Sequence, residues 1–161
     1  MELTTIHLMR HGEVDNPGGV VYGRMKGFGL TPLGKEMAQV VADFLVAEGR
    51  DITTVIASPL LRAQQSAQPT ALAYDVPIQT DRRLIEADSV FEGVAVNKNR
   101  WVLAHPRNWG HYVRPHEPSW GEPFTEVAAR MMAAVYDARD AARGQRFRGS
   151  DRAVPKAPRL F

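Results

Sequence analysis

Residues 53–67 read TTVIASPLLRAQQSA, and they carry the plainest indication of the fold class. The β-branched run from Thr53 to Ala57 predicts a short strand. Ser58 and Pro59 come next and predict the start of a helix that continues to about Ala73. A strand that passes directly into a helix is the repeating unit of parallel sheets covered by helices.

The chain before this stretch follows the same order. Thr4–Met9 is rich in β-branched and apolar residues, and it predicts a strand that ends at the polar turn 10–12. Thr31 and Pro32 then predict the start of a helix that Gly49 closes. The apolar residues of this predicted helix recur at helical spacing and form one face: Leu33, Met37, Val40, Val41, Phe44 and Leu45.

The chain after this stretch continues the alternation. Ile78–Thr80 predicts a brief strand, and Pro123 predicts the start of a last helix that ends near Gly144. The predicted apolar face of that helix comprises Phe124, Val127, Ala128, Met131, Val135 and Ala138. The whole pattern predicts an α/β fold, a three-layer α/β/α sandwich around a mainly parallel sheet.

Composition narrows the classes of protein that fit. The 161 residues suffice for one domain, and the absence of cysteine excludes disulfides, thiol nucleophiles and cysteine-ligated zinc. No apolar run approaches the roughly 20 residues that span a bilayer, and the N-terminus does not resemble a signal peptide. We therefore expect a cytoplasmic protein without a membrane partner.

Charge is distributed unevenly along the chain. Residues 145–161 carry a net charge of +4, whereas residues 1–144 carry −2, so the pI of about 9.1 comes from the C-terminal segment. That segment has two aromatic residues for stacking on bases, Phe147 and Phe161, which makes a nucleic-acid partner unexpected. We expect one domain over 1–144, followed by a basic, disordered tail over 145–161.

Three polar groups follow the predicted strands. Arg10 and His11 come directly after the first strand, Arg62 lies one turn into the helix after the second, and Glu86 follows the third. The carboxyl ends of parallel strands form one edge of a sheet, where ligands bind. Guanidinium groups suit an anion, and imidazole suits a nucleophile or base near neutral pH. Each group taken singly is more often structural, as a salt-bridged or surface residue.

The order of these motifs resembles the histidine phosphatase superfamily, the phosphoglycerate mutase-like group. The resemblance covers about residues 4–143 and rests on five motifs: LMRHGEV at 8–14, YGR at 22–24, LTPLG at 30–34, SPLLRAQQSA at 58–67 and RLIEADSVFEG at 83–93. It implies a phosphomonoester hydrolase that works through a phosphohistidine, with a small-molecule phosphate as its partner and with neither metal nor cofactor.

The resemblance also implies a role for each matched residue. His11 corresponds to the nucleophile, and a hydrogen bond to one ring nitrogen would leave the other free to attack. Glu86 corresponds to the general acid. The implied phosphate ligands are Arg10 and Arg62, with Asn16 as a further contact. The implied borders of the pocket are Tyr22, Gly23 and Arg24.

The sequence departs from the family pattern after Gly144. The family has a valine-rich strand there that ends in Ser-His, whereas this chain continues with Gln145-Arg146-Phe147-Arg148. The remaining histidines are His7, His105, His111 and His116. We therefore expect an incomplete sandwich that lacks its C-terminal strands, and a truncation or frame shift is the hypothesis for its origin.

Several alternatives remain open at this stage. Phosphatase is favoured over mutase because the middle segment does not resemble that of the glycolytic mutases. A catalytically impaired phosphate-binding or regulatory module is the alternative outside the enzyme class. A metal site on His105, His111 and His116 is disfavoured because no ligand pattern of Asp or Glu accompanies them. The sequence leaves the substrate and the oligomeric state undetermined.

Overall fold

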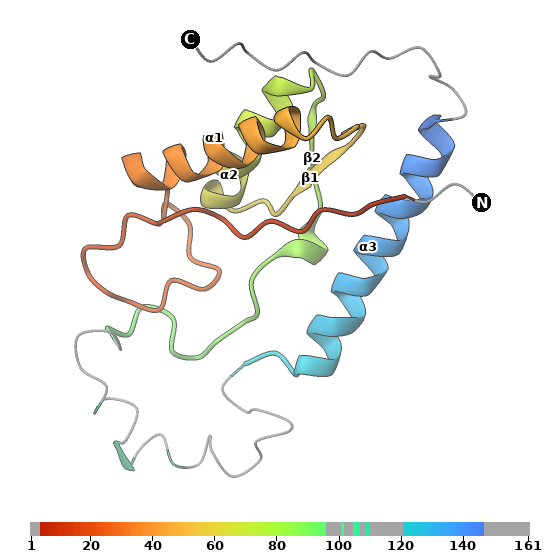
Figure 1. Ribbon diagram of the computed structural model, residues 1–161. Helices are drawn as coiled ribbons and strands as arrows, with labels where there is room; N and C mark the ends of the chain where they lie inside the picture. The colour runs from red at the N-terminus through yellow and green to blue at the C-terminus, as the bar shows by residue number, and fades with distance from the viewer. Residues whose placement is uncertain (1–3, 96–100, 102–104, 107–108, 110–120, 147–161) are drawn as a thin grey trace.

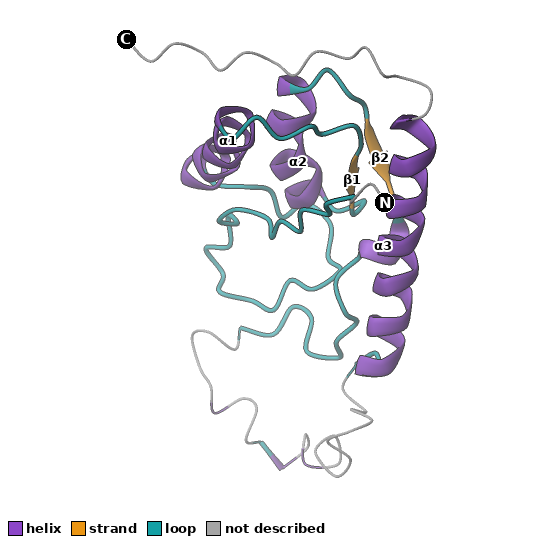
Figure 2. Cartoon of the chain, turned by 45° about the vertical axis from the view of Figure 1, so that its right-hand side comes forward, coloured by secondary structure: helices purple, strands orange, loops and turns teal. Residues whose placement is uncertain are grey.

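The computed structural model describes residues 4–95, 101, 105–106, 109 and 121–146. Its elements, in chain order, are helix α1 (Pro32–Ala47), strand β1 (Val55–Ala57), helix α2 (Leu61–Ala73), strand β2 (Ile78–Thr80), the 3-10 helix η1 (Arg82–Leu84) and helix α3 (Phe124–Arg146). Figure 1 shows that α3 lies on the opposite side of the strands from α1 and α2, and Figure 2 shows the same three layers. The predicted α/β class is confirmed.

The two strands form the parallel pair that the sequence predicts. β1 and β2 are hydrogen-bonded in parallel, with Val55 opposite Ile78 and Ala57 opposite Thr80. Because α2 connects them, the unit is a strand–helix–strand crossover, which brings the carboxyl ends of both strands to one edge. The hydrophobic core lies between this pair, α1 and α2: Leu45, Val46, Val55, Ala57, Ala67, Ala71, Tyr74 and Val76.

Helix α1 begins as predicted but buries a different face. The Thr31 hydroxyl accepts a hydrogen bond from the Gly34 amide at 2.9 Å, Pro32 is the first helical residue, and Gly49 follows the helix at φ 61°. The buried residues are Gly34, Ala38, Ala42, Leu45 and Val46. Of the predicted face, Leu45 is buried, whereas Leu33, Met37, Val40 and Phe44 are 48–65% exposed. Helix α1 packs on α2, and its small side chains form the face that permits this close approach.

The predicted strand over Thr4–Met9 is wrong. Residues 4–9 have no regular secondary structure, and Leu8 and Met9 are exposed. A strand requires backbone partners on a neighbouring strand, and among the described residues β1 and β2 pair with each other. β-branched composition alone provides no hydrogen-bond partner, so it overestimates strand formation here.

The starts and ends of the other two helices differ slightly from prediction. α2 begins at Leu61 rather than at Pro59, because Ser58 and Pro59 belong to the preceding turn, in which the Ser58 hydroxyl lies 3.5 Å from the Leu60 amide. α3 follows Pro123 as predicted and ends at Arg146, two residues beyond Gly144. Ala134 is buried, whereas Phe124, at the first turn, is exposed.

None of the helices in the described part of the chain combines the length and apolar character that crossing a membrane requires. Of the tail predicted over residues 145–161, the first two residues belong to α3 instead, because the helix continues to Arg146. Residues 147–161 lie outside the described residues, so their disorder stays a prediction.

Candidate active site

Gly12 is the point at which three sequence motifs meet. Its amide donates to the Ser66 hydroxyl at 3.1 Å, and that hydroxyl donates to the Arg62 carbonyl at 2.8 Å. A β-carbon on Gly12 would lie 2.3 Å from the Gly34 carbonyl oxygen, a distance that no real side chain adopts. The His11 loop is therefore held between the first turn of α1 and the first turns of α2.

The loop after Gly12 is fastened to the N-terminus of α1. The Thr31 amide donates to the Glu13 carbonyl at 3.0 Å, and the Thr31 hydroxyl donates to the Glu13 carboxylate at 2.6 Å. The Leu30 amide donates to Gln65 Oε1 at 2.7 Å, which links the same turn to α2. Glu13 thus has a structural role, although it stands two residues from the expected nucleophile.

The ring of His11 is held in one tautomer. Its Nδ1 lies 2.8 Å from the Gly12 carbonyl oxygen. A carbonyl can only accept a hydrogen bond, so Nδ1 carries a proton, and in the neutral ring the lone pair is then on Nε2. This is the state that the sequence analysis requires of a nucleophilic histidine.

Arg62 is a buried cation against the Tyr22 ring. It is 1% exposed, its Nη2 donates to the Gly23 carbonyl at 2.6 Å, and its guanidinium lies 4.7 Å from the centre of the Tyr22 ring. Its Nη1 is buried and has no hydrogen-bond partner among the described residues. A buried charged donor without a partner is costly, and an anion would satisfy it.

Tyr22 connects Arg62 to His11. Its ring packs edge to face against the His11 ring, with 6.3 Å between the ring centres, and stacks on the Phe28 ring, with 5.3 Å between the ring centres. The resemblance implies Tyr22 and Gly23 at the border of the pocket. Tyr22 contacts both the expected nucleophile and the expected anion ligand, and Gly23 contacts the anion ligand. Their contact with a substrate stays a prediction.

Glu86 reaches the same place from the segment after η1. Its Oε2 lies 3.7 Å from Arg62 Nη2, and its side chain is 50% exposed. A half-exposed carboxyl group beside a guanidinium can exchange protons with solvent, which general acid–base chemistry requires. The structure thus brings together three of the predicted groups, namely His11, Arg62 and Glu86.

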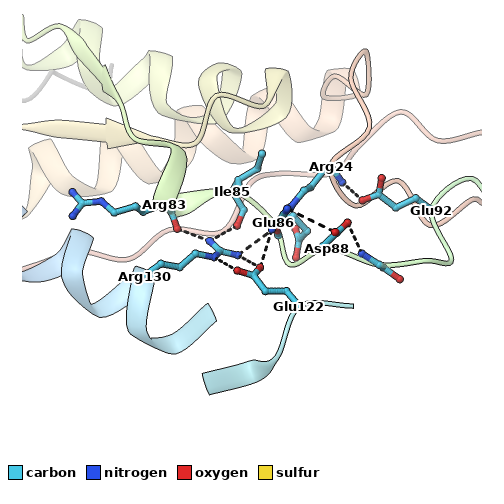
Figure 3. Close-up of polar contacts among 9 residues, drawn as sticks. Arg24, Arg83, Ile85, Glu86, Asp88, Glu92, Glu122 and Arg130 are labelled. Atoms are coloured by element: carbon cyan, nitrogen blue, oxygen red, sulfur yellow. Dashed lines mark hydrogen bonds and ion pairs between the residues drawn. The ribbon is translucent and has the colours of Figure 1, made fainter. Parts of the chain in front are cut away.

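Arg24 contacts the backbone that carries Glu86. Its Nε donates to the Glu86 carbonyl at 2.9 Å, and its Nη2 donates to the Glu122 carboxylate at 2.8 Å (Figure 3). The Asp88 carboxylate lies 4.0 Å from Arg24 Nη1, and the backbone amide of Arg24 donates to the Glu92 carboxylate. The Arg24 guanidinium therefore contacts the Glu86 backbone and the carboxylates of Glu122 and Asp88, and its role in a substrate pocket stays a prediction.

Arg10 and Asn16, the other two predicted phosphate ligands, make no contact with Arg62 in the described part of the chain. Arg10 is exposed. Asn16 closes its own loop, since its Nδ2 donates to the Val20 carbonyl at 2.9 Å and its Oδ1 accepts from the Val20 amide at 3.2 Å. For both residues, phosphate binding stays a prediction.

Two residues that sequence reasoning missed surround the Glu86 segment. Arg130 on α3 donates to the carbonyl groups of Arg83 and Ile85, and a bidentate ion pair joins it to Glu122 (Figure 3). The Arg130 guanidinium lowers the pKa of Glu122, and the same hydrogen bonds raise the pKa of Arg130. The sequence did contain one signal for Arg130. It lies three residues after Val127 and four before Ala134, so it is a cation on the inward-facing side of α3.

The described residues form no candidate metal site. They contain no group of three or more His, Cys, Asp or Glu side chains placed to hold an ion. Of the three histidines considered for such a site, His111 and His116 lie outside the described residues.

Comparisons with known proteins agree with these motifs. The model of the histidine phosphatase superfamily (branch 1) matches residues 6–147. An uncharacterized protein of Mycobacterium tuberculosis is 48% identical over 138 residues, which are 86% of this chain and 67% of that protein. A Proteus mirabilis protein, named a probable phosphoglycerate mutase, is 32% identical over 81% of this chain and 60% of its own length.

Solved structures show the same fold. YhfR of Bacillus stearothermophilus superposes with a TM-score of 0.65 at 26% identity, over 82% of this chain and 65% of its own. The alpha-ribazole phosphatase of Shigella flexneri gives a TM-score of 0.64 at 23% identity, over 84% of this chain and 67% of its own. The chain thus spans about two thirds of the length of these relatives. With motifs 8–14, 30–34 and 58–67 interlocked around Gly12, the chain belongs to the histidine phosphatase superfamily, branch 1.

Proposed function

We propose that this protein hydrolyses small-molecule phosphomonoesters through a phosphohistidine on His11. One observation carries the proposal: the buried, partly unpartnered Arg62 guanidinium lies between the Tyr22 ring, which contacts His11, and the Glu86 carboxylate. An anion at Arg62 Nη1 would satisfy the buried donor. It would also stand beside a nucleophile on one side and a proton donor on the other.

The first half of the proposed reaction forms the phosphohistidine. The lone pair on His11 Nε2 attacks phosphorus, and the bond between phosphorus and the leaving oxygen breaks as Glu86 gives its proton to that oxygen. Arg62 balances the charge on the phosphoryl oxygens during transfer. Nδ1 keeps its proton and its hydrogen bond to Gly12, so the ring holds its orientation throughout.

The second half releases phosphate. The Glu86 carboxylate takes a proton from water, the water oxygen bonds to phosphorus, and the bond between phosphorus and Nε2 breaks. The half-exposed position of Glu86 favours water as the acceptor. Return of the phosphoryl group to a second hydroxyl would be mutase chemistry. This is the alternative function, because one relative is named a probable phosphoglycerate mutase.

The test is hydrolysis of p-nitrophenyl phosphate by the purified chain without added metal, compared with His11→Ala. We expect turnover in the wild type, loss of turnover in His11→Ala, and an acid-labile phosphoryl group on the wild-type protein after rapid quenching. His7→Ala is the matched control, because His7 is exposed. A folded wild-type chain that binds phosphate without turnover would instead support the phosphate-binding module.

A further inference from the structure

Arg130 makes contacts that a surface cation on a helix would not make. Nε and Nη2 each donate to the Glu122 carboxylate at 2.8 Å, Nη1 donates to the Arg83 and Ile85 carbonyls, and Nη2 reaches the Glu86 carbonyl at 3.4 Å. A guanidinium has five N–H donors, and these contacts use all five. Arg130 therefore has no donor left for a substrate.

The three carbonyl groups belong to the segment that ends at Glu86. Arg83 lies within η1, whereas Ile85 and Glu86 follow it and belong to neither strand nor helix, so these carbonyl groups need partners from elsewhere. Arg130 provides one partner for all three. Hydrogen bonds from a charged donor are shorter and stronger than neutral ones, and here the donor side chain is only 17% exposed.

Glu122 fixes Arg130 and a second guanidinium in place. Its carboxylate accepts from Arg130 and from Arg24, and both guanidinium groups also contact the Glu86 carbonyl. Its own amide lies 3.3 Å from the Asp88 carbonyl, and Gly121 pairs with Ser89. Figure 3 shows Arg130, on α3, and Glu122 beside Glu86.

We propose that Arg130, oriented by Glu122, is the positioning residue that holds the Glu86 carboxyl group at the reacting phosphate. This role rests on the proposed hydrolase function, because Glu86 acts there as the proton donor. A displacement of about 1 Å in a catalytic group can lower the rate by roughly 100-fold. Loss of Arg130 is therefore expected to impair proton donation more than phosphate binding.

The leaving group of the substrate distinguishes this role from general damage. p-Nitrophenolate leaves without being protonated, whereas the alkoxide of β-glycerophosphate needs the proton of Glu86. The quantity to compare is kcat/KM, which reports the steps up to formation of the phosphohistidine and not its later hydrolysis. We expect Arg130→Met to lower kcat/KM roughly 10- to 100-fold on β-glycerophosphate and at most about 3-fold on p-nitrophenyl phosphate.

Three further variants frame the result. Glu86→Gln should show the same contrast between substrates. Arg130→Lys keeps the charge and three donors, so its loss should be intermediate. Arg139→Met is the matched control on the same helix, because its guanidinium is bonded to the exposed Asp140 and lies over Tyr136. We expect Arg139→Met to match the wild type on both substrates.

Hydrogen exchange of the amides of residues 84–89 provides a readout that does not depend on activity. Exchange should be faster in Arg130→Met than in the wild type and in Arg139→Met. Equal losses on both substrates, or unchanged exchange, would overturn the positioning role. A wild-type chain inactive on both esters would refute the hydrolase itself, and exchange alone would then decide whether Arg130 anchors the Glu86 segment.

Discussion

Gly12 and Gly34 pack backbone against backbone, and this contact joins the loop of His11 to the first turn of α1. A β-carbon on Gly12 would lie 2.3 Å from the Gly34 carbonyl oxygen, and one on Gly34 would lie 2.1 Å from the Glu13 carbonyl oxygen. Both obstacles are backbone atoms, which cannot turn aside as a flexible side chain can. Two glycines from separate motifs are therefore required by one contact.

Substitution of either glycine by alanine is expected to destabilise the fold. An alanine within a helix is worth about 1 kcal/mol relative to glycine, but forced backbone shifts cost about 1–3 kcal/mol or more, so the clash outweighs the gain at Gly34. We expect Gly12→Ala and Gly34→Ala to lower the free energy of unfolding by about 2 kcal/mol in urea titrations.

Gly18→Ala is the control for this prediction. A β-carbon there would meet Val20 Cγ1 at 3.5 Å, an ordinary contact. Stability of Gly12→Ala equal to that of Gly18→Ala would show that the His11 loop and the first turn of α1 do not need their close approach.

Arg62→Met is expected to move phosphate binding and stability in opposite directions. Phosphate affinity, measured by calorimetry, should fall by about 3 kcal/mol, the scale of losing one strong anion donor. The free energy of unfolding should rise by about 1 kcal/mol, because an apolar side chain of similar size removes a buried charge with an unpartnered donor.

Arg50→Met serves as the control for both quantities. Its guanidinium pairs with Glu48 on the surface, where both side chains are about half exposed, so neither quantity should change appreciably. A large loss of stability in Arg62→Met would mean that Arg62 is chiefly a structural cation.

The Glu122 pair makes stability depend on pH on the acid side. Arg130, and then Arg24, lower the pKa of Glu122 in the folded state below that of the unfolded chain. A carboxyl group of this kind stabilises the fold above its unfolded pKa of about 4.3, and the contribution is lost as the pH falls through the folded pKa. We expect the free energy of unfolding to decrease as the pH falls below about 4.

Glu122→Gln isolates this contribution. Urea titrations between about pH 3 and 7 should show a smaller pH dependence than in the wild type, and lower stability at neutral pH. Glu36→Gln, which changes an exposed carboxylate on α1, should keep the wild-type slope. Identical slopes in wild type and Glu122→Gln would contradict the prediction.

Arg62 and Glu86 were within reach of sequence reasoning because each follows a strand that the sequence predicts correctly, whereas His11 was identified from its motif, since residues 4–9 form no strand. Thr31 and Pro32 predicted the start of α1, and the run ending at Ala57 predicted β1. These signals act locally, through a cap, a fixed φ angle or β-branched side chains. The positions of Arg62 and Glu86 relative to those elements followed from them.

The buried face of α1 and the role of Arg130 were beyond sequence reasoning. The heptad-like spacing of Met37 and Phe44 marks an apolar stripe, but whether a helix buries that stripe or its small residues depends on the element packed against it. Likewise, the inward-facing position of Arg130 on α3 indicates that it has a partner, but nothing local shows that the partners are carbonyl groups 44 to 47 residues earlier.

The chain by itself therefore establishes the α/β class, the family and the three chemical groups expected at one edge of the sheet, because capping, periodicity and motif order act over short distances. Packing of distant segments establishes the rest. The Gly12–Gly34 contact, the buried charge of Arg62 and the anchoring of Glu86 by Arg130 all depend on atoms far apart in sequence. Backbone hydrogen-bonding groups outside helices and strands must find such distant partners, and only folding brings them within reach.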